Sequence, residues 1–408
     1  MTNRYLFTVL RMPPTPDQSR RSWRFGFTAV LVLAMVAATQ MPAGLGILAP
    51  FMRDDLGVSR TQIGILITTT ILVSAFISPL MGRITDSLGG RKGIAVLFLS
   101  AGLGLVGLAF TSSYWWMLVP VGVSALAQAF GNPVTNKLIA THTSPGRRGI
   151  VTGIKQSGVQ VGIFVAGLTM PVVAVAWGWR WAIGLVVVVP LVGLLMALAL
   201  LPSDERTVVG NQAGTRSGAD RLPTAIMFLT AYGALMGFGA AYTFLVPLFA
   251  EEALGMSEQA GGAAAGLIGF VSLFARIGWS RYADAHSRHD LTLAILAVGS
   301  VGAVLVFIVA QEGAPWLLWI GAIATGITSS SWNSVGMLAV IDHAGEEQSG
   351  RASGIVMFGF LAGLGVAPTL FGWLVDRTDS YTPMWLISVG ALAMAAVLAV
   401  WWVRRPRQ

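Results

Sequence analysis

The 408-residue sequence has no cysteine, only four histidines and few charged side chains. Without thiols the chain can form neither disulfide bonds nor thiolate metal sites, and all four histidines fall in predicted connecting segments. We therefore expect no metal and no cofactor. Charged residues make up 11% of the chain and hydrophobic residues 55%, with a mean hydropathy of +0.72. The surface of a soluble domain needs far more charge, so most side chains are predicted to face lipid or other helices.

Apolar stretches long enough to cross a hydrocarbon core of about 30 Å recur along the whole sequence. They predict an all-α polytopic membrane protein with twelve transmembrane helices. The predicted spans are residues 25–50, 61–82, 93–111, 115–140, 150–173, 180–201, 224–250, 260–282, 291–310, 315–341, 352–375 and 382–403.

Positive charge is distributed unevenly between the two sides of these predicted spans. Most of the 26 Lys and Arg residues fall on the side of the N-terminus, and only Arg53, Arg60, Arg180 and Arg377 fall on the other. By the positive-inside rule, both termini are predicted to be cytoplasmic in the inner (plasma) membrane. The net charge of +8 therefore marks topology, and we expect the lipid bilayer rather than nucleic acid as a partner.

One polar, glycine-containing stretch interrupts the apolar pattern between the sixth and seventh predicted spans, and it has the composition of a flexible linker. It divides the chain into two six-helix halves. The predicted segments are a cytoplasmic tail (1–24), an N-terminal half (25–201), a cytoplasmic linker (202–222), a C-terminal half (223–403) and a cytoplasmic tail (404–408).

An internal repeat relates the two halves. Gly153, Gly158 and Gly162 in the fifth predicted span recur, with the same spacing, 201 residues later as Gly354, Gly359 and Gly363. At the same offset, Asn132 of the fourth span aligns with Asn333 of the tenth. Repeats of this kind are typical of transporters built from two pseudo-symmetric halves.

The loop after the second predicted span carries a small residue, an acid and a basic pair, namely Gly82, Asp86, Arg91 and Lys92. This loop resembles the GxxxD(R/K)xG pattern, followed by basic residues, of the major facilitator superfamily, and departs from it at Ser87 and Gly90. A degenerate copy after the eighth span retains Arg281 and Asp284.

The resemblance implies a monomeric secondary transporter that carries a small-molecule substrate, with or without a coupling ion, by alternating access. We expect the six residues of the two loops to form a conformational switch, because charge-assisted bonds near helix ends can break when the halves rock. The alternative is that these charges only fix topology and cap helices.

Lys155, inside the fifth predicted span, is the charged residue that we single out. A lysine near a helix centre costs about 2.5–3.5 kcal/mol on membrane-insertion scales, and such residues usually have a function. Its repeat counterpart is Val356, so the fold itself does not require a charge there. We interpret Lys155 as a counter-charge for an anionic substrate. The alternatives are that it snorkels to the cytoplasmic interface or makes a structural bond between helices.

Several polar and aromatic side chains lie at membrane depth in the first, fourth, seventh and tenth spans. In the superfamily these spans line the central cavity, so the resemblance places the side chains around the substrate. The alternative is that they tie helices together. The predicted substrate-binding residues besides Lys155 are Gln40, Gln128, Asn132, Tyr242, Trp332 and Asn333.

The predicted function is transport of a small polar solute, an organic anion such as a carboxylate. No acidic residue falls in the middle of a span, and the fifth span lacks the glycine-proline signature of drug antiporters in the superfamily. An efflux pump for amphipathic compounds or drugs is the alternative, since methionine and aromatic side chains give an adaptable cavity. A non-transporting receptor is a remote third possibility. An enzyme is not expected, because no nucleophile, metal-ligand set or acid pair is clustered.

Overall fold

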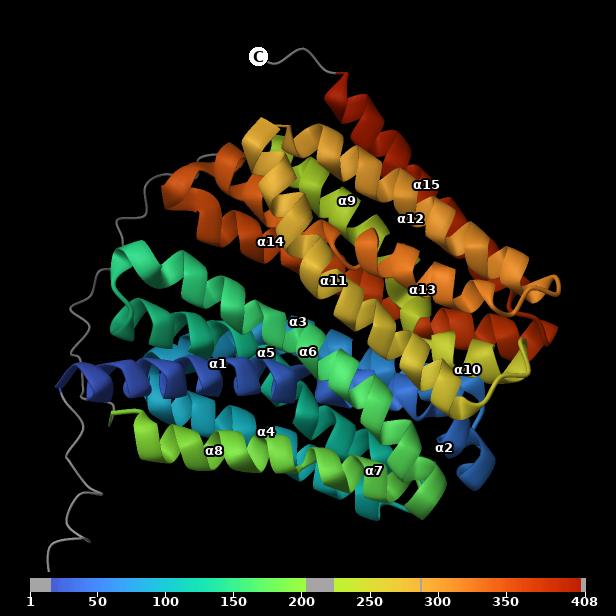
Figure 1. Ribbon diagram of the computed structural model, residues 1–408, viewed down its shortest axis with the longest axis horizontal. Coiled ribbons are helices and arrows are strands. Elements are labelled where there is room, and N and C mark those ends of the chain that lie inside the picture. Colours follow the sequence, from blue (N-terminus) through green and yellow to red (C-terminus); the bar gives the residue numbers. More distant parts are fainter. Residues whose placement is uncertain (1–15, 203–223, 287, 405–408) are drawn as a thin grey trace, which may run out of the picture.

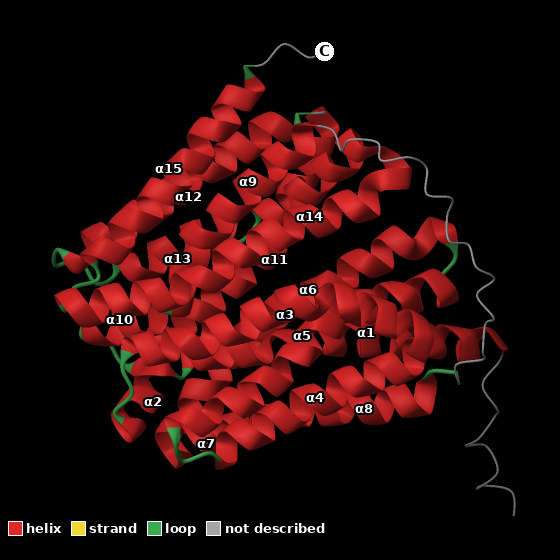
Figure 2. Cartoon of the chain, turned by 180° about the vertical axis from the view of Figure 1, so that it is seen from behind, coloured by secondary structure: helices red, strands yellow, loops and turns green. Residues whose placement is uncertain are grey.

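The structure is a computed structural model that describes residues 16–202, 224–286 and 288–404. All the regular structure in these residues is helical, which confirms the predicted all-α class (Figure 2). The predicted N-terminal tail (1–24), linker (202–222) and C-terminal tail (404–408) lie largely outside the described residues.

Fifteen α-helices and one 3₁₀ helix (η1) follow one another in the described residues. Their bounds are α1 Pro16–Ile47, α2 Ala49–Leu56, α3 Arg60–Leu88, α4 Gly90–Phe110, α5 Tyr114–His142, α6 Pro145–Trp177, α7 Trp179–Val186, α8 Val188–Leu200, α9 Thr224–Ala240, η1 Ala241–Phe244, α10 Val246–Glu252, α11 Glu258–His286, α12 His289–Gln311, α13 Leu317–Ile327, α14 Trp332–Thr378 and α15 Thr382–Val403.

Eleven helical segments in the described residues are long and apolar enough to cross a membrane. The tenth predicted span, 315–341, is not among them, because α13 ends at Ile327 and α14 begins at Trp332. Thr328 and three serines occupy the break, and such side chains compete with helical hydrogen bonding. Ser331 shows this directly, since its hydroxyl donates to the Gly326 carbonyl oxygen at 2.8 Å.

Helix α14 turns back on itself. The Asn333 Nδ2 atom lies 3.3 Å from the Met357 Sδ atom, although the two residues are 24 positions apart. A straight helix would separate them by about 36 Å at 1.5 Å per residue. The first arm of α14 therefore continues the line of the predicted tenth span, and its second arm contains the candidate span Ala352–Thr378.

The helices gather into two bundles, α1–α8 and α9–α15, that lie against each other (Figure 1). Helix α3 packs against α14 and α6 packs against α11 across the seam. A Cβ atom added at Gly64 or Gly372 would overlap backbone atoms of Pro368 or Arg60, respectively. Glycine at these two positions thus lets α3 and α14 approach to backbone contact.

The two ends of the molecule differ in how closely the bundles meet. We call the end where α3 begins the Arg60 end, and the end where α3 gives way to α4 the Lys92 end. The bundles meet around α2 and α10 at the Arg60 end, and their ribbons diverge toward the Lys92 end (Figure 1). Gly153 and Gly354, the first glycines of the repeat, have no atom within 4 Å of an added Cβ. The seam is therefore closely packed at the Arg60 end and open around these two glycines at the Lys92 end.

Candidate functional site

Lys155 lies on α6 with its side chain fully buried and directed at α5. Its ammonium group donates to Thr135 Oγ1 at 2.7 Å, to Asn136 Oδ1 at 2.6 Å and to Asn132 Oδ1 at 3.3 Å. These three acceptors match the three protons of an ammonium group. The side chain therefore turns across to the neighbouring helix instead of reaching along α6 toward the Lys92 end.

The three acceptors share one face of α5, because they stand at positions i, i+3 and i+4. Asn132 and Asn136 are exposed, whereas Thr135 is buried. Asn132 Oδ1 also accepts a hydrogen bond of 3.0 Å from the Gln156 amide. All these acceptors are neutral, and no carboxylate pairs with Lys155 in the part of the chain that the structure describes. A buried charge without a counter-ion is costly.

Two of the predicted polar residues offer acceptors close to this region. Gln40 on α1 is 4% exposed and packs against Gly162 of α6. The side-chain Oε1 atoms of Gln40 and Gln128 are buried and have no hydrogen-bond partner in the described structure. Unsatisfied buried oxygens are rare in folded proteins, and polar ligands or water commonly satisfy them.

The aromatic members of the predicted site are enclosed in the second bundle. The Tyr242 hydroxyl is within 2.8 Å of Thr325 Oγ1, and its ring packs on Phe307 and Trp385. Trp332 is 1% exposed and packs on the rings of Tyr232 and Phe360. In this conformation the two side chains belong to an aromatic core, and the structure does not bring them to Lys155.

A buried hydrogen bond joins the bundles near Lys155. The Ser272 hydroxyl of α11 donates to Gln160 Oε1 of α6 at 2.6 Å. Neither residue was predicted as part of the site. Gln160 could have been found from its position between the two repeat glycines Gly158 and Gly162, where a polar residue at membrane depth needs a partner.

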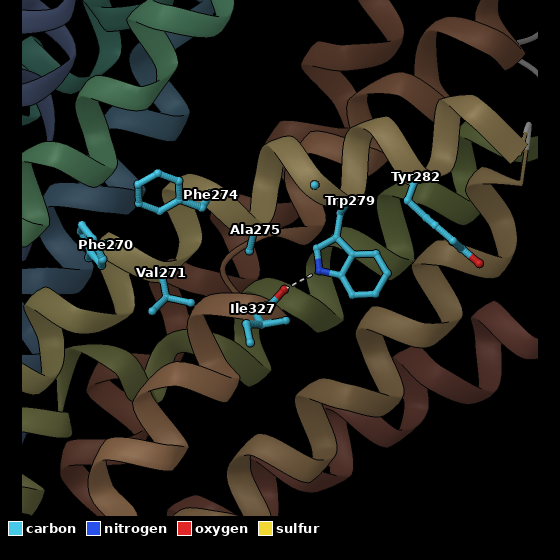
Figure 3. A pocket seen from close by; sticks show the side chains of 8 residues that line it. Phe270, Val271, Phe274, Ala275, Trp279, Tyr282 and Ile327 are labelled. Atoms are coloured by element: carbon cyan, nitrogen blue, oxygen red, sulfur yellow. Dashed lines mark hydrogen bonds between the residues drawn. The ribbon is translucent and has the colours of Figure 1, made fainter.

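Two side chains of α11 satisfy the carbonyl groups freed by the break between α13 and α14. Arg276 Nε donates to the Ser330 carbonyl oxygen at 3.0 Å. Trp279 Nε1 donates to the Ile327 carbonyl oxygen at 2.8 Å (Figure 3). Such groups at a helix end need partners when they are buried. Arg276 is therefore an intramembrane cation that the hydropathy pattern assigned only to the end of a span.

A charged cluster closes the seam at the Arg60 end. Glu252 of α10 pairs with Arg53 and with Arg60, whose Nε atom lies 2.8 Å from Glu252 Oε2. The Tyr381 hydroxyl donates to the same oxygen at 2.6 Å, and burial raises the pKa of this hydroxyl, so it stays protonated. We call Arg53, Arg60, Glu252, Tyr381 and Asp376 the Arg60 lock.

Asp376 of α14 anchors the lock to the start of α3. It accepts from the Thr61 backbone N–H at 2.8 Å, from the Thr61 hydroxyl at 2.5 Å and from the Arg60 backbone N–H at 3.1 Å. A carboxylate at a helix N-terminus is favoured by the unpaired amides there and by the helix dipole. The Arg60 lock thus connects residues 192 and 316 positions apart in sequence, from both bundles.

The predicted switch residues lie at the opposite end. Arg91 donates to the Leu198 carbonyl oxygen at 2.6 Å, and Lys92 is exposed. Arg281 and Asp284 are exposed, and neither forms an ion pair within the described ranges. Gly82 has open space around it. The side chain of Asp86 lies outside the described residues, so the predicted switch stays a prediction.

Comparison with known proteins identifies a family. The model of the Major Facilitator Superfamily matches residues 26–319 and, in a second match, residues 227–408. The hexuronate transporter of Bacillus subtilis is 24% identical over 386 residues, which cover 88% of this chain and 89% of that protein. The "Probable sulfoacetate transporter SauU" of Cupriavidus necator is 25% identical over 396 residues, covering 87% and 88%.

The fold is also shared with solved structures. A bacterial homologue of the human lysosomal transporter Spinster, solved in an inward-facing and occupied conformation, has a TM-score of 0.71. The alignment covers 94% of this chain and 97% of that one at 16% identity. At this level of identity the likeness establishes the architecture alone.

Proposed function

The chain belongs to the major facilitator superfamily, and from this premise we propose that it is a secondary active transporter of a small polar organic anion, such as a carboxylate. The observation that carries the proposal is the buried charge of Lys155, which has three neutral acceptors and no carboxylate in the described residues. The two relatives are named as transporters of hexuronate and sulfoacetate, which agrees with an anionic substrate. Family and relatives are transporters, which favours transport over an enzymatic reaction.

The proposed topology has twelve spans in the inner membrane, with α13 and the first arm of α14 together forming the tenth. Both termini and the linker 202–222 are then cytoplasmic, and the halves are residues 25–201 and 223–403. The Lys92 end faces the cytoplasm in this arrangement. Because the seam is closely packed at the Arg60 end and open around Gly153 and Gly354 at the Lys92 end, the described conformation is an inward-facing one.

In this geometry, alternating access means that the seam closes at the Lys92 end when it opens at the Arg60 end, and the reverse. A solute that enters from the Lys92 end reaches the Lys155 site, with Asn132, Gln40 and Gln128 as neighbouring hydrogen-bonding groups. Closure at the Lys92 end would use the predicted switch residues, and opening at the other end requires the Arg60 lock to break. Each charge-assisted hydrogen bond in that lock is worth about 1.5–3 kcal/mol.

The experiment that tests the proposal measures thermal stabilisation and proteoliposome uptake with small organic anions, neutral polar solutes and amphipathic cations. One class of anion should stabilise the protein and be taken up, and Lys155→Gln should reduce uptake at least tenfold while the protein remains folded. Arg288→Gln is the matched control, because it removes an exposed arginine outside the site. Unchanged anion uptake by Lys155→Gln would refute the role of Lys155.

Export of amphipathic compounds is the second candidate function, and one surface feature favours it. A groove of about 550 Å³ between α11 and α13 is lined almost entirely by apolar and aromatic atoms (Figure 3). Phe274 in this groove is 59% exposed. Competition by hydrophobic cations, but not by small carboxylates, would support export. Ligand binding without any transport would instead support the receptor alternative.

A further inference from the structure

Arg276 is an intramembrane cation that the Lys155 site does not account for. It lies on α11, about 15 Å from the end of that helix at 1.5 Å per residue. Within the described chain its side chain makes a single hydrogen bond, from Nε to the Ser330 carbonyl oxygen, and no ion pair. A guanidinium carries five N–H donors, so the four on Nη1 and Nη2 have no protein acceptor. Ionisable groups at this depth are rare and usually functional.

The position of Arg276 on α11 directs it to the seam between the bundles. Gly262, Gly266 and Gly269 form the face of α11 that packs on α6. Arg276 stands seven residues after Gly269, which returns it nearly to that face, and three residues before Trp279, which contacts α13. Its side chain is therefore on the part of α11 that lies between α6 and α13.

Lys155 lies at the same depth on the opposite helix. The contacts between α6 and α11 run in antiparallel order: Gly262 meets Gly167, Gly266 meets Phe164, and Ser272 meets Gln160. Continuing the register four residues past Ser272 on α11 leads to Arg276. The matching step back from Gln160 on α6 leads to residues 155–156. Each bundle thus contributes one cation, just beyond the Gln160–Ser272 hydrogen bond.

We propose that Arg276 binds the carboxylate or sulfonate group of the substrate directly and that one anion is held between Arg276 and the Lys155 site. This inference rests on the proposed anion transport. The bond from Nε to Ser330 fixes the guanidinium plane and leaves the two Nη groups for a bidentate pair with an oxyanion. Lys155 is enclosed by its three acceptors, so it contributes positive potential through the exposed amides of Asn132 and Asn136.

The pairing also gives the substrate a way to bring the bundles together. Arg276 and Lys155 stand at matching depths on helices that pack across the seam, so their positive charges repel in the empty protein, which favours separation of the bundles at the Lys92 end. An anion between them is attracted to both cations, and this attraction replaces their repulsion. The substrate then stabilises the closed arrangement through contacts that the open one cannot make with both halves, as a conformational switch requires.

The test uses the full-length protein with glucuronate and sulfoacetate as anionic probes and glucose as the uncharged comparison. Apparent Kd from thermal stabilisation and proteoliposome uptake are measured for the original sequence, Arg276→Lys, Arg276→Gln, Lys155→Gln and Trp279→Phe. Arg276→Gln should weaken anion binding at least tenfold, and Arg276→Lys about threefold to tenfold, because lysine retains the charge but not the bidentate fork. Trp279→Phe removes the second α11 side chain that donates to a carbonyl at the break between α13 and α14. This variant should lower the melting temperature without changing the Kd for anions.

The outcomes separate this inference from the proposed function. If anions bind the original protein and Arg276→Gln equally well, Arg276 is no ligand and anion transport stands. If Arg276→Gln fails to fold, the Arg276→Lys protein provides the test. An anion affinity in Arg276→Lys equal to that of the original protein would overturn the proposed bidentate contact. If no anionic probe binds the original protein while amphipathic cations do, the proposed function and the inference both fail. Equal losses in Trp279→Phe and Arg276→Gln would assign Arg276 a purely structural role.

Discussion

Neutralising Glu252 should release the Arg60 lock. Its carboxylate is 8% exposed and binds Arg53, Arg60 and the Tyr381 hydroxyl at once. Glu252→Gln keeps an acceptor for Tyr381 but loses two charge-assisted contacts, each worth about 1.5–3 kcal/mol. The arginine side chains are 30% and 21% exposed, and after a discount of about half for solvent screening the closed end loses about 1.5–3 kcal/mol. This corresponds to a shift of about 10- to 150-fold in the equilibrium between the two conformations.

The absence of native cysteine makes this shift measurable by labelling one introduced thiol. Thr68 lies on α3 in the seam, where its hydroxyl accepts a 2.8 Å hydrogen bond from Thr369 of α14. A Thr68→Cys protein should react slowly with a membrane-impermeant maleimide from the Arg60 side, and Glu252→Gln should accelerate the reaction. Asp54→Asn is the matched control. This carboxylate also pairs with Arg53, but the pair is long, at 3.6 Å, and the Asp54 side chain is 57% exposed, so its loss should have little effect. Equal labelling rates in folded Glu252→Gln and its parent would refute the lock.

Two further perturbations test the packing and the electrostatics of the same end. Gly372→Ala should increase the rate of thiol labelling in the Thr68→Cys protein, because the added Cβ would overlap the Arg60 backbone and prevent full closure of the seam. Gly390→Ala is its control, because an added Cβ there meets no other atom. Hydrogen bonds from Trp179 and Arg180 hold the pKa of the Asp55 carboxyl below its usual value. The stability that these bonds give the folded protein is present above the unfolded-state pKa of about 3.9, and it is lost as the pH falls through the lower folded-state pKa. Asp55→Asn should therefore flatten the acid-side fall of the melting temperature, and an unchanged pH profile would contradict the pairing.

Hydropathy predicted the helices well because a membrane requires long, self-satisfied helices. It could not predict the break at Thr328–Ser331. The surrounding residues remain apolar enough for a span, and the exposed carbonyls are stabilised by Arg276 and Trp279 from another helix. Local sequence therefore set where a helix could exist, and tertiary contacts decided where it ended.

The candidate site was only partly predictable. Lys155 was identified from its depth and from its apolar repeat counterpart, and both can be read from the sequence without knowing which residues surround it. Its partners Thr135 and Asn136 depend on the register between α5 and α6, and the Arg60 lock joins residues that hydropathy treated as separate loop charges. Tyr242 was assigned to a cavity from its span number, but large aromatic rings at helix contacts also pack well inside a bundle.

The residues that carry the proposed function are those that break the internal repeat. Lys155 aligns with Val356, and Arg276 aligns with Ser78 at the offset of 198 that pairs Asp86 with Asp284. The shared scaffold therefore does not require either cation, yet they lie at matching depths on facing helices. At the Arg60 end the charges of the two bundles are of opposite sign and hold the bundles together, whereas at the proposed substrate site they are of the same sign. The empty protein is then expected to favour closure at the Arg60 end, and an anion is the chemical class of ligand that reverses the balance at the other end.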